Sequence, residues 1–492
     1  MAGAYASQSE SHEHSGWLAP LVFLVLFAVF YVTALPLMDD SDVPWHLATG
    51  KLLLETHRVP TTDPWSFASN GQPWYLLSWI WDLILGVVER CFGLFGVLIF
   101  MLAASAATVA LLTAHLLTRP IALPAILFTV MMAGLCILDF ITARPHLSGY
   151  IMALVFYILL HRSRESTRYG ALLLLPPLMA MWANMHGSFI AGFTVLGAFL
   201  IEAYATGRRD WCKHLFLISI ACAFCAALNP YGLDVIIGAM RTLNGSMKKY
   251  TIEWLPFAFS ASAGVSAWLI VFIMATNLRG SRAAIADKIL AIGWLVATFF
   301  IMRNGPIFIL LSAPYLATCL DEATEGLREI RPPSPFQNFM DRQKLRHVWI
   351  ATLCIFAAMV AVVYKLPHDD KIMSEDMSAY DAIDFAVQHY PDHRFLSDFN
   401  FGGQIIYREG NKLPFFMDSR AATVYGEKAM QDYIEFIWQR DGWQERLAPY
   451  HINGLLISKA TVFAKSYEFG QYRQDWQLVF AGKRANVYIA RP

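Results

Sequence analysis

The stretch "MDDSDVPWHLATG", residues 38–50, follows a long apolar run and opens with three carboxylates. These belong to Asp39, Asp40 and Asp42, and an imidazole follows at His46. Charge is costly at a membrane edge, so ionisable side chains in such a place are a functional-site hypothesis by default. The segment therefore predicts both the point where the chain leaves a membrane and the place where its chemistry lies.

The composition is typical of an integral membrane protein. Of the 492 residues, 56% are hydrophobic and only 15% are charged, which is far too apolar for an ordinary soluble protein. The 38 basic and 38 acidic side chains give no formal net charge, so no overall field favours nucleic acid as a partner. The seven cysteines lie in or beside apolar segments and predict no disulfide framework.

A run of about 20 apolar residues crosses the hydrocarbon core as a helix, and by this rule we expect about eleven spans. Residues 1–16 contain no Lys or Arg and so lack the basic start of a signal peptide, and residues 17–37 are interpreted as a retained first span. Lys and Arg concentrate in one set of short connections, which should be cytoplasmic. The expected spans are 17–37, 92–116, 121–138, 147–161, 170–185, 188–205, 214–228, 258–278, 287–302, 306–320 and 347–364.

The opposite set of connections carries the sequences with polar, turn-forming residues. Each of them follows an odd-numbered span, which predicts a single outward-facing cavity lined by several span ends. These sequences are "MDDSDVPWH" (38–46), "DFITARPH" (139–146), "WANMHG" (182–187), "LNPYG" (228–232) and "MRNGP" (302–306).

Two parts lie outside the predicted membrane. The first outer loop, residues 38–91, should form a surface helix at 45–57 and a second one at 75–93 that leads into a span. Residues 365–492 are more polar and predict a small α/β domain, attached to a transmembrane domain of residues 1–364. In this domain, strands are expected at 393–399, 412–420, 452–459, 476–483 and 485–492, with helices at 379–390 and 427–450.

Three interpretations of the carboxylates stay open. They could cap the surface helix, with Asp42 near its N-cap. Asp40, Asp42 and His46 could bind a divalent cation, although "DDSD" lacks the spaced ligands of a calcium loop. One carboxylate could act as a general base on a sugar hydroxyl, since burial and like charge would raise its pKa.

Arg144 and Arg303 stand at predicted span ends, where they could receive a lipid-linked phosphate. The alternative for each is snorkelling or pairing with an aspartate.

Three histidines share the outer edge, where a ligand or proton-transfer role competes with ordinary packing. They are His46, His146 and His186. Asp418 and Arg420 lie on a predicted loop after a strand, where they could bind substrate or stabilise a turn.

"DSDVPWHLATGKLLLETHRVPTTDPWSF" (40–67) and "GQPW" (71–74), with "WANMHGSF" (182–189), "LNPYG" and "FFMDSRAATVYG" (415–426), resemble motifs of the GT-C superfamily of integral-membrane glycosyltransferases. The resemblance covers most of the chain and is densest in residues 38–80. It implies a mainly α-helical polytopic fold with a C-terminal periplasmic α/β domain. Asp39 lies outside the DxDxxWH pattern, and Pro44 falls where an aromatic residue is common.

The resemblance further implies an inverting transfer of a hexosyl or pentosyl group from a polyprenyl-phosphate donor to an envelope lipid or glycan, at the outer face of a bacterial inner membrane. Asp40 would be the base and Asp42 an alternative base. Substrate contacts are expected from Asp39, His46, Arg144, His146, His186, Arg303 and Arg420. Some relatives require a divalent cation and others do not. The competing functions are transport of a lipid-linked saccharide and a non-catalytic role in polysaccharide assembly.

Overall fold

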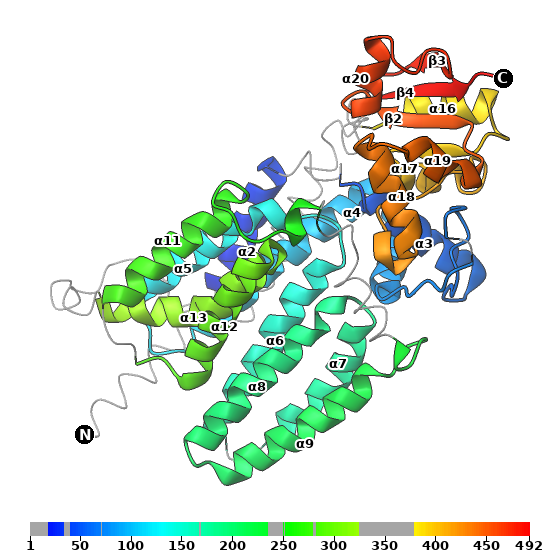
Figure 1. The fold of residues 1–492 in the computed structure, drawn as a ribbon. Helices are drawn as coiled ribbons and strands as arrows, with labels where there is room; N and C mark the ends of the chain where they lie inside the picture. The colour runs from blue at the N-terminus through cyan, green and yellow to red at the C-terminus, as the bar shows by residue number, and fades with distance from the viewer. Residues whose placement is uncertain are drawn as a thin grey trace, which may run out of the picture.

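The computed structural model consists of a helical bundle and a C-terminal part that contains a β-sheet (Figure 1). It describes residues 18–33, 40–69, 71–166, 169–234, 249, 251–278, 282–323 and 378–492. Asp39 and the expected span 347–364 lie outside these residues.

A helix occupies every expected span that falls within the described residues. Three stretches there are long and apolar enough to cross a membrane, Trp79–Leu116, Gly187–Ala205 and Met302–Ala323. The helices are α2 (Leu18–Thr33), α4 (Trp79–Leu116), α5 (Leu123–Cys136), α6 (His146–Glu165), α7 (Leu175–Ala183), α8 (Ile190–Ala205), α9 (Arg209–Ala226), α11 (Ala263–Leu278), α12 (Ile285–Phe300) and α13 (Gly305–Ala323).

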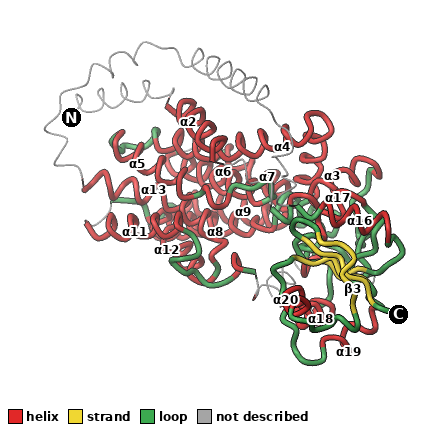
Figure 2. Tube along the Cα trace, turned by 90° about the horizontal axis from the view of Figure 1, so that it is seen from above, coloured by secondary structure: helices red, strands yellow, loops and turns green. Residues whose placement is uncertain are grey.

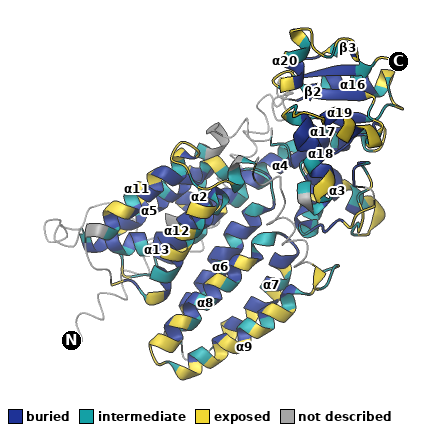
Figure 3. Cartoon of the chain, in the orientation of Figure 1, coloured by how far each residue is buried: buried dark blue, intermediate teal, exposed yellow. Residues whose placement is uncertain are grey.

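The outer surface of the bundle carries many exposed apolar side chains, as along α9 in Figure 3. Phe216, Leu217, Ile220 and Phe224 of this helix are each more than half exposed. Monomeric soluble proteins rarely expose contiguous apolar surface of this kind. The bundle is therefore suited to a lipid environment, as the composition predicted.

A helix is present at both positions expected in the first loop, but most residues of the first helix are buried, so it is not the surface helix that the sequence predicted. The first is α3 (Val43–Thr56). The second forms the beginning of α4, which is interrupted at Gly93 with φ 66° and ψ −170°. Glycine tolerates this positive φ, so the chain can turn there from the surface helix into the span.

The C-terminal part contains a four-stranded sheet of order β1-β2-β4-β3. The first pair is parallel and the other two pairs are antiparallel. Figure 2 shows the sheet beside α16 and α17, apart from the long helices of the bundle. The elements are α16 (Tyr380–His389), β1 (Phe395–Ser397), α17 (Gly402–Glu409), α18 (Glu427–Ile437), α19 (Trp443–Leu447), β2 (Gly454–Ser458), α20 (Val462–Glu468), β3 (Trp476–Ala481) and β4 (Ala485–Ala490).

Two expectations for this domain were wrong. Residues 412–420 form no strand but make single bridges through Phe415 to Phe395 and to Ser66 of the first loop. Pro414 has no N–H for a continuous ladder. The helix expected at 427–450 is broken after Ile437, because Gln439 and Gly442 take φ values of 47° and 82°.

The first loop belongs partly to the C-terminal core. Val43 and Leu47 of α3 pack into the bundle's buried cluster. Trp45 and Ala48, on another side of the same helix, pack with the buried residues of the C-terminal domain, as does Trp74. The segment that carries the aspartates is therefore held between the two hydrophobic cores.

Candidate active site

His46 is held by a close crossing of α3 and α4. An added Cβ at Gly50 would lie 2.2 Å from the Asp82 carbonyl oxygen, so only glycine permits this approach. The crossing places His46 Nδ1 2.6 Å from Asp82 Oδ1, and Ser78 Oγ donates to Asp82 Oδ2 at 3.1 Å. The Asp82 carboxylate therefore fixes the orientation of the His46 imidazole.

Asp40 and Asp42 form a tight turn before α3. The backbone N–H of Asp42 donates to Asp40 Oδ1 at 2.8 Å, and Trp45 Nε1 donates to Asp42 Oδ1 at 3.3 Å. Asp42 occupies the N-cap position, but its side chain makes no capping hydrogen bond to the helix backbone. Helix capping therefore does not account for this carboxylate.

Arg144 connects the acids. Its Nη2 lies 2.7 Å from Asp42 Oδ2, and its Nη1 lies 3.4 Å from Asp40 Oδ2. The same Nη2 is 3.3 Å from Glu253 Oε1. The loop between α5 and α6 thus supplies a guanidinium to the acids of the first loop, as the prediction of one shared outer site required.

Glu253 was missed by the sequence analysis. It lies in η5 (Ile252–Trp254) and forms a second ion pair with Arg303 of η6 (Met302–Asn304). Arg303 also lies over the Trp254 ring, 5.3 Å from its centroid. A signal for Glu253 existed, because only Asp234 and Glu253 are acidic in the outer connection 229–257. We name the cluster of Asp40, Asp42, Arg144, Glu253 and Arg303 the outer cluster.

The two aspartates differ in their electrostatics. Burial raises the pKa of Asp40, with help from the neighbouring Asp42, and Arg144 only partly offsets this. Burial would also raise the pKa of Asp42, but Arg144, a hydrogen bond from the Ser419 hydroxyl and His46 together lower it. Environments that push two acids apart assign them different roles. The two acids therefore differ in how readily they take up a proton, which Asp40 does at a higher pH than Asp42.

His146 and His186 lie at the margin of the outer cluster. His146 Nε2 is 2.8 Å from the Phe140 carbonyl oxygen, and His186 Nδ1 accepts from the Ser188 N–H at 3.2 Å. Burial, followed by the positive charge of Arg303, holds the pKa of His186 well below its usual range. A neutral ring at this place can accept a hydrogen bond.

Arg420 does not join the outer cluster. Its guanidinium is fully buried and contacts Asp418 Oδ2 at 2.6 Å and Asp63 Oδ1 at 2.8 Å. The rings of Trp65 and Trp74 lie 5.0 and 4.8 Å from it. Of the two roles considered from the sequence, this arrangement matches the turn-stabilising one.

The side chains proposed as metal ligands fit an ion poorly. Asp40 and Asp42 share the Arg144 guanidinium, whereas His46 uses only Nδ1 in its contact with Asp82. Among the residues that the structure describes, no three His, Cys, Asp or Glu side chains are grouped as a metal site would need. The Arg144 guanidinium thus lies where the sequence suggested a metal cation.

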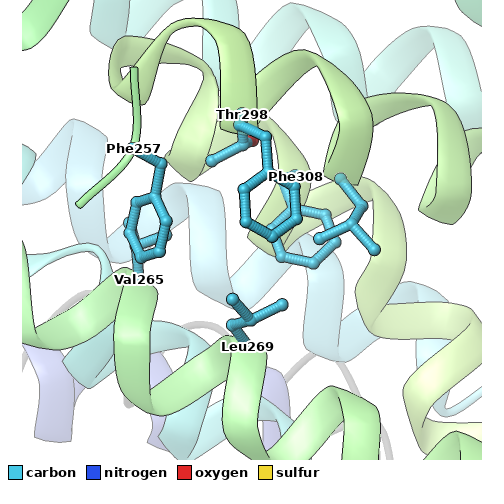
Figure 4. A pocket seen from close by; sticks show the side chains of 7 residues that line it. Phe257, Val265, Leu269, Thr298 and Phe308 are labelled. Atoms are coloured by element: carbon cyan, nitrogen blue, oxygen red, sulfur yellow. The ribbon is translucent and has the colours of Figure 1, made fainter. Parts of the chain in front are cut away.

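An apolar crevice lies beside the outer cluster, between α11, α12 and α13 (Figure 4). It is lined by Phe257, Val265, Leu269, Leu295, Thr298, Phe299 and Phe308, which pack closely enough to leave no room for a water molecule. The backbone N–H of Phe257 donates to the Phe299 carbonyl at 3.2 Å. Since Phe257 and Phe299 are each four residues from a partner of the Glu253–Arg303 ion pair, the crevice adjoins the polar site.

No family model matches the chain, and no curated protein matches it in sequence. Solved structures do share its fold. One is the crystal structure of the Archaeoglobus fulgidus oligosaccharyltransferase tethered with an acceptor peptide containing the NVT sequon (TM-score 0.59, 12% identity, 90% of this chain and 69% of that chain). Another is the same protein in complex with Zn and sulfate (TM-score 0.55, 12% identity, 89% and 68%).

These neighbours have the GT-C fold of membrane glycosyltransferases. The mainly helical, GT-C-like fold predicted from the motifs is therefore confirmed, while the number of spans and the periplasmic location stay predictions. An identity of 12% leaves activity and substrate to the residues of this chain.

Proposed function

We propose that the protein is an inverting glycosyltransferase that moves a sugar from a polyprenyl-phosphate donor to an envelope lipid or glycan. The observation that carries the proposal is the aspartate pair beside Arg144, in which Asp40 has a raised pKa and Asp42 a lowered one. A base works best when its pKa moves towards the operating pH and a second group fixes its surroundings.

In the proposed reaction, Asp40 accepts the proton of the acceptor hydroxyl as its oxygen bonds to the anomeric carbon. The bond from that carbon to the phosphate oxygen breaks on the opposite face, and the electron pair leaves with the lipid phosphate. Asp42 stays ionised, and Arg144 keeps the acids in place. His46, His146 and His186 line the margin of the site as candidate substrate contacts.

We assign the departing phosphate to Arg303. Its side chain is 25% exposed, against 15% for Arg144, and it pairs with one acid rather than three. Charge-assisted hydrogen bonds from a guanidinium stabilise phosphate oxygens strongly.

The remaining expectations complete the proposal. Residues 1–364 would form a membrane domain of about eleven spans in a bacterial inner membrane, and residues 365–492 a periplasmic domain. Arg420 is assigned to positioning rather than to substrate binding. A structural neighbour is in complex with Zn, so the test includes a chelator, although the proposed reaction uses no metal cation.

The test is transfer of labelled sugar from a panel of polyprenyl-phosphate donors by the purified full-length protein, with and without chelator. Wild type should consume one donor, and Asp40→Asn should not. Equal binding of labelled donor by both proteins without any turnover would favour transport of a lipid-linked saccharide or an assembly role instead.

A further inference from the structure

The DSR turn, Asp418–Ser419–Arg420, is fixed to the first outer loop by buried charges. Arg420 is bonded to Asp418 through Nε at 2.9 Å and through Nη2 at 2.6 Å, and Nη1 reaches Asp63. Tyr425 OH adds a hydrogen bond to Asp418 Oδ2 at 2.8 Å. Buried networks with their polar atoms satisfied are rigid, so the backbone at residue 419 has little freedom.

Two glycines bring the start of α17 against both the DSR turn and the aspartate turn. A Cβ at Gly402 would lie 2.3 Å from Asp418 Cβ, and one at Gly403 would lie 2.7 Å from the Ser41 carbonyl oxygen. Both distances are shorter than any real contact of a Cβ. The three backbones are therefore packed as closely as glycine permits.

This packing places the Ser419 side chain against the turn that carries Asp40 and Asp42. Its hydroxyl donates a hydrogen bond to the Ser41 carbonyl oxygen, 3.4 Å away. Ser41 separates the two acids in the chain, so a hydroxyl held here constrains the whole turn.

We propose that Ser419 is a positioning residue, through which the C-terminal domain holds Asp40 and Asp42 in the geometry for sugar transfer. This inference rests on the proposed function. It assigns the domain a part in building the catalytic site, beyond any role in recruiting an acceptor. Small misplacements of reacting groups cost up to about 100-fold in rate.

The test compares wild type with Ser419→Ala and Ser419→Thr in the full-length protein. Ser466→Ala, in the distant helix α20, is the matched control. We expect Ser419→Ala to lower kcat about tenfold to 100-fold with the KM for donor within about twofold, because positioning acts on the reacting groups. Ser419→Thr keeps the hydroxyl and should restore most of kcat, and the melting temperatures should agree.

Hydrogen exchange of residues 40–46 gives a readout that needs no turnover, and we expect faster exchange in Ser419→Ala than in wild type or Ser466→Ala. Unchanged kcat in Ser419→Ala would overturn the inference, as would a Ser419→Thr protein as slow as Ser419→Ala. If wild type transfers no sugar, the proposed function fails by itself. Faster exchange in Ser419→Ala would then still support the contact, and unchanged exchange would refute it.

Discussion

Two ionic clusters at opposite ends of the same helix show how similar residues serve different purposes. Arg144 precedes α6 and belongs to the outer cluster, whereas Arg164 lies in the last turn of α6. Because α6 has 20 residues, about 30 Å separates its two ends. We name the second group, Arg119, Tyr157, Arg164, Glu202 and Asp287, the inner cluster.

The inner cluster is closed. Asp287 accepts from Arg119 at 2.6 Å and from Tyr157 at 2.8 Å. Glu202 binds Arg164 at 2.6 Å and the backbone N–H of Ala286 at 2.8 Å. Two carboxylates face two guanidiniums, and the Asp287 side chain has no exposed surface. The cluster joins α6, α8 and α12 with the end of α4.

The outer cluster has the opposite balance. Its two arginines face three carboxylates, and the Glu253 side chain is 28% exposed. It therefore has one more carboxylate than guanidinium groups, and it has exposed surface that a substrate can contact. A balanced, closed group stabilises the fold, while an unbalanced and accessible one retains a capacity for chemistry.

Asp40→Asn should have the largest effect, because it removes the proposed base while preserving shape. We expect transfer to fall by about 10²–10⁴-fold, as measured by initial rates with saturating donor. The matched control is Asp139→Asn, an exposed acid that contacts Ser262 outside the cluster, which should change the rate less than about twofold. Equal losses in both variants would show that the effect is not specific to the outer cluster.

Asp287→Asn should act on stability instead. Breaking a buried ion pair by removing one partner costs about 3–5 kcal/mol, so the variant should unfold at a clearly lower temperature in detergent. Asp384→Asn is its control, because the Asp384–Arg408 pair at 2.8 Å is largely exposed and contributes less than about 1 kcal/mol. A slow but fully stable Asp287→Asn protein would contradict a structural role for the inner cluster.

The pH profile sharpens the comparison from the outer side. A base must be ionised, so transfer should fall as the pH drops through the raised pKa of Asp40, above its ordinary value of 3.8. Arg144 holds that pKa down, and Arg144→Gln should move the acidic limb of kcat up by about 1–3 pH units. An acidic limb that does not shift in this variant would show that a group other than Asp40 titrates.

Arg303→Lys should have the smallest effect. Lysine keeps the charge but loses the planar contact with Trp254, which lies 5.3 Å from the guanidinium. A cation–π contact contributes about 0.5–1 kcal/mol at a partly exposed site, equivalent to roughly two- to fivefold in rate. Inhibition by free polyprenyl phosphate should weaken in parallel, and unchanged inhibition would place the phosphate elsewhere.

Much of the fold could be predicted because it depends on local pattern. Apolar runs predicted the helices. The polar residues at the span ends predicted that Asp40, Asp42, Arg144 and Arg303 lie close together, as they do in the structure. The expected strand at 412–420 failed because its apolar residues are buried by crossing towards the first loop rather than by pairing within the sheet.

The contacts that were missed depend on partners remote in the chain. Arg420 and Asp63 are 357 residues apart, and Ser419 and Ser41 are 378 apart. Glu253 is one of two acids in its connection, and its role depends on Arg144 and Arg303, which approach from other connections. The periodicity of a single sequence does not encode contacts between residues so remote in the chain.

The position of α3 between two cores also has a consequence for biosynthesis. One side of α3 can pack as soon as the first helices have assembled, but the surface that receives Trp45 and Ala48 is translated several hundred residues later. Domains form in the order in which the ribosome makes them. The aspartate turn is therefore among the first segments to be synthesised and among the last to reach its final form, so a nascent chain still on the ribosome would carry its acids in an unfinished site.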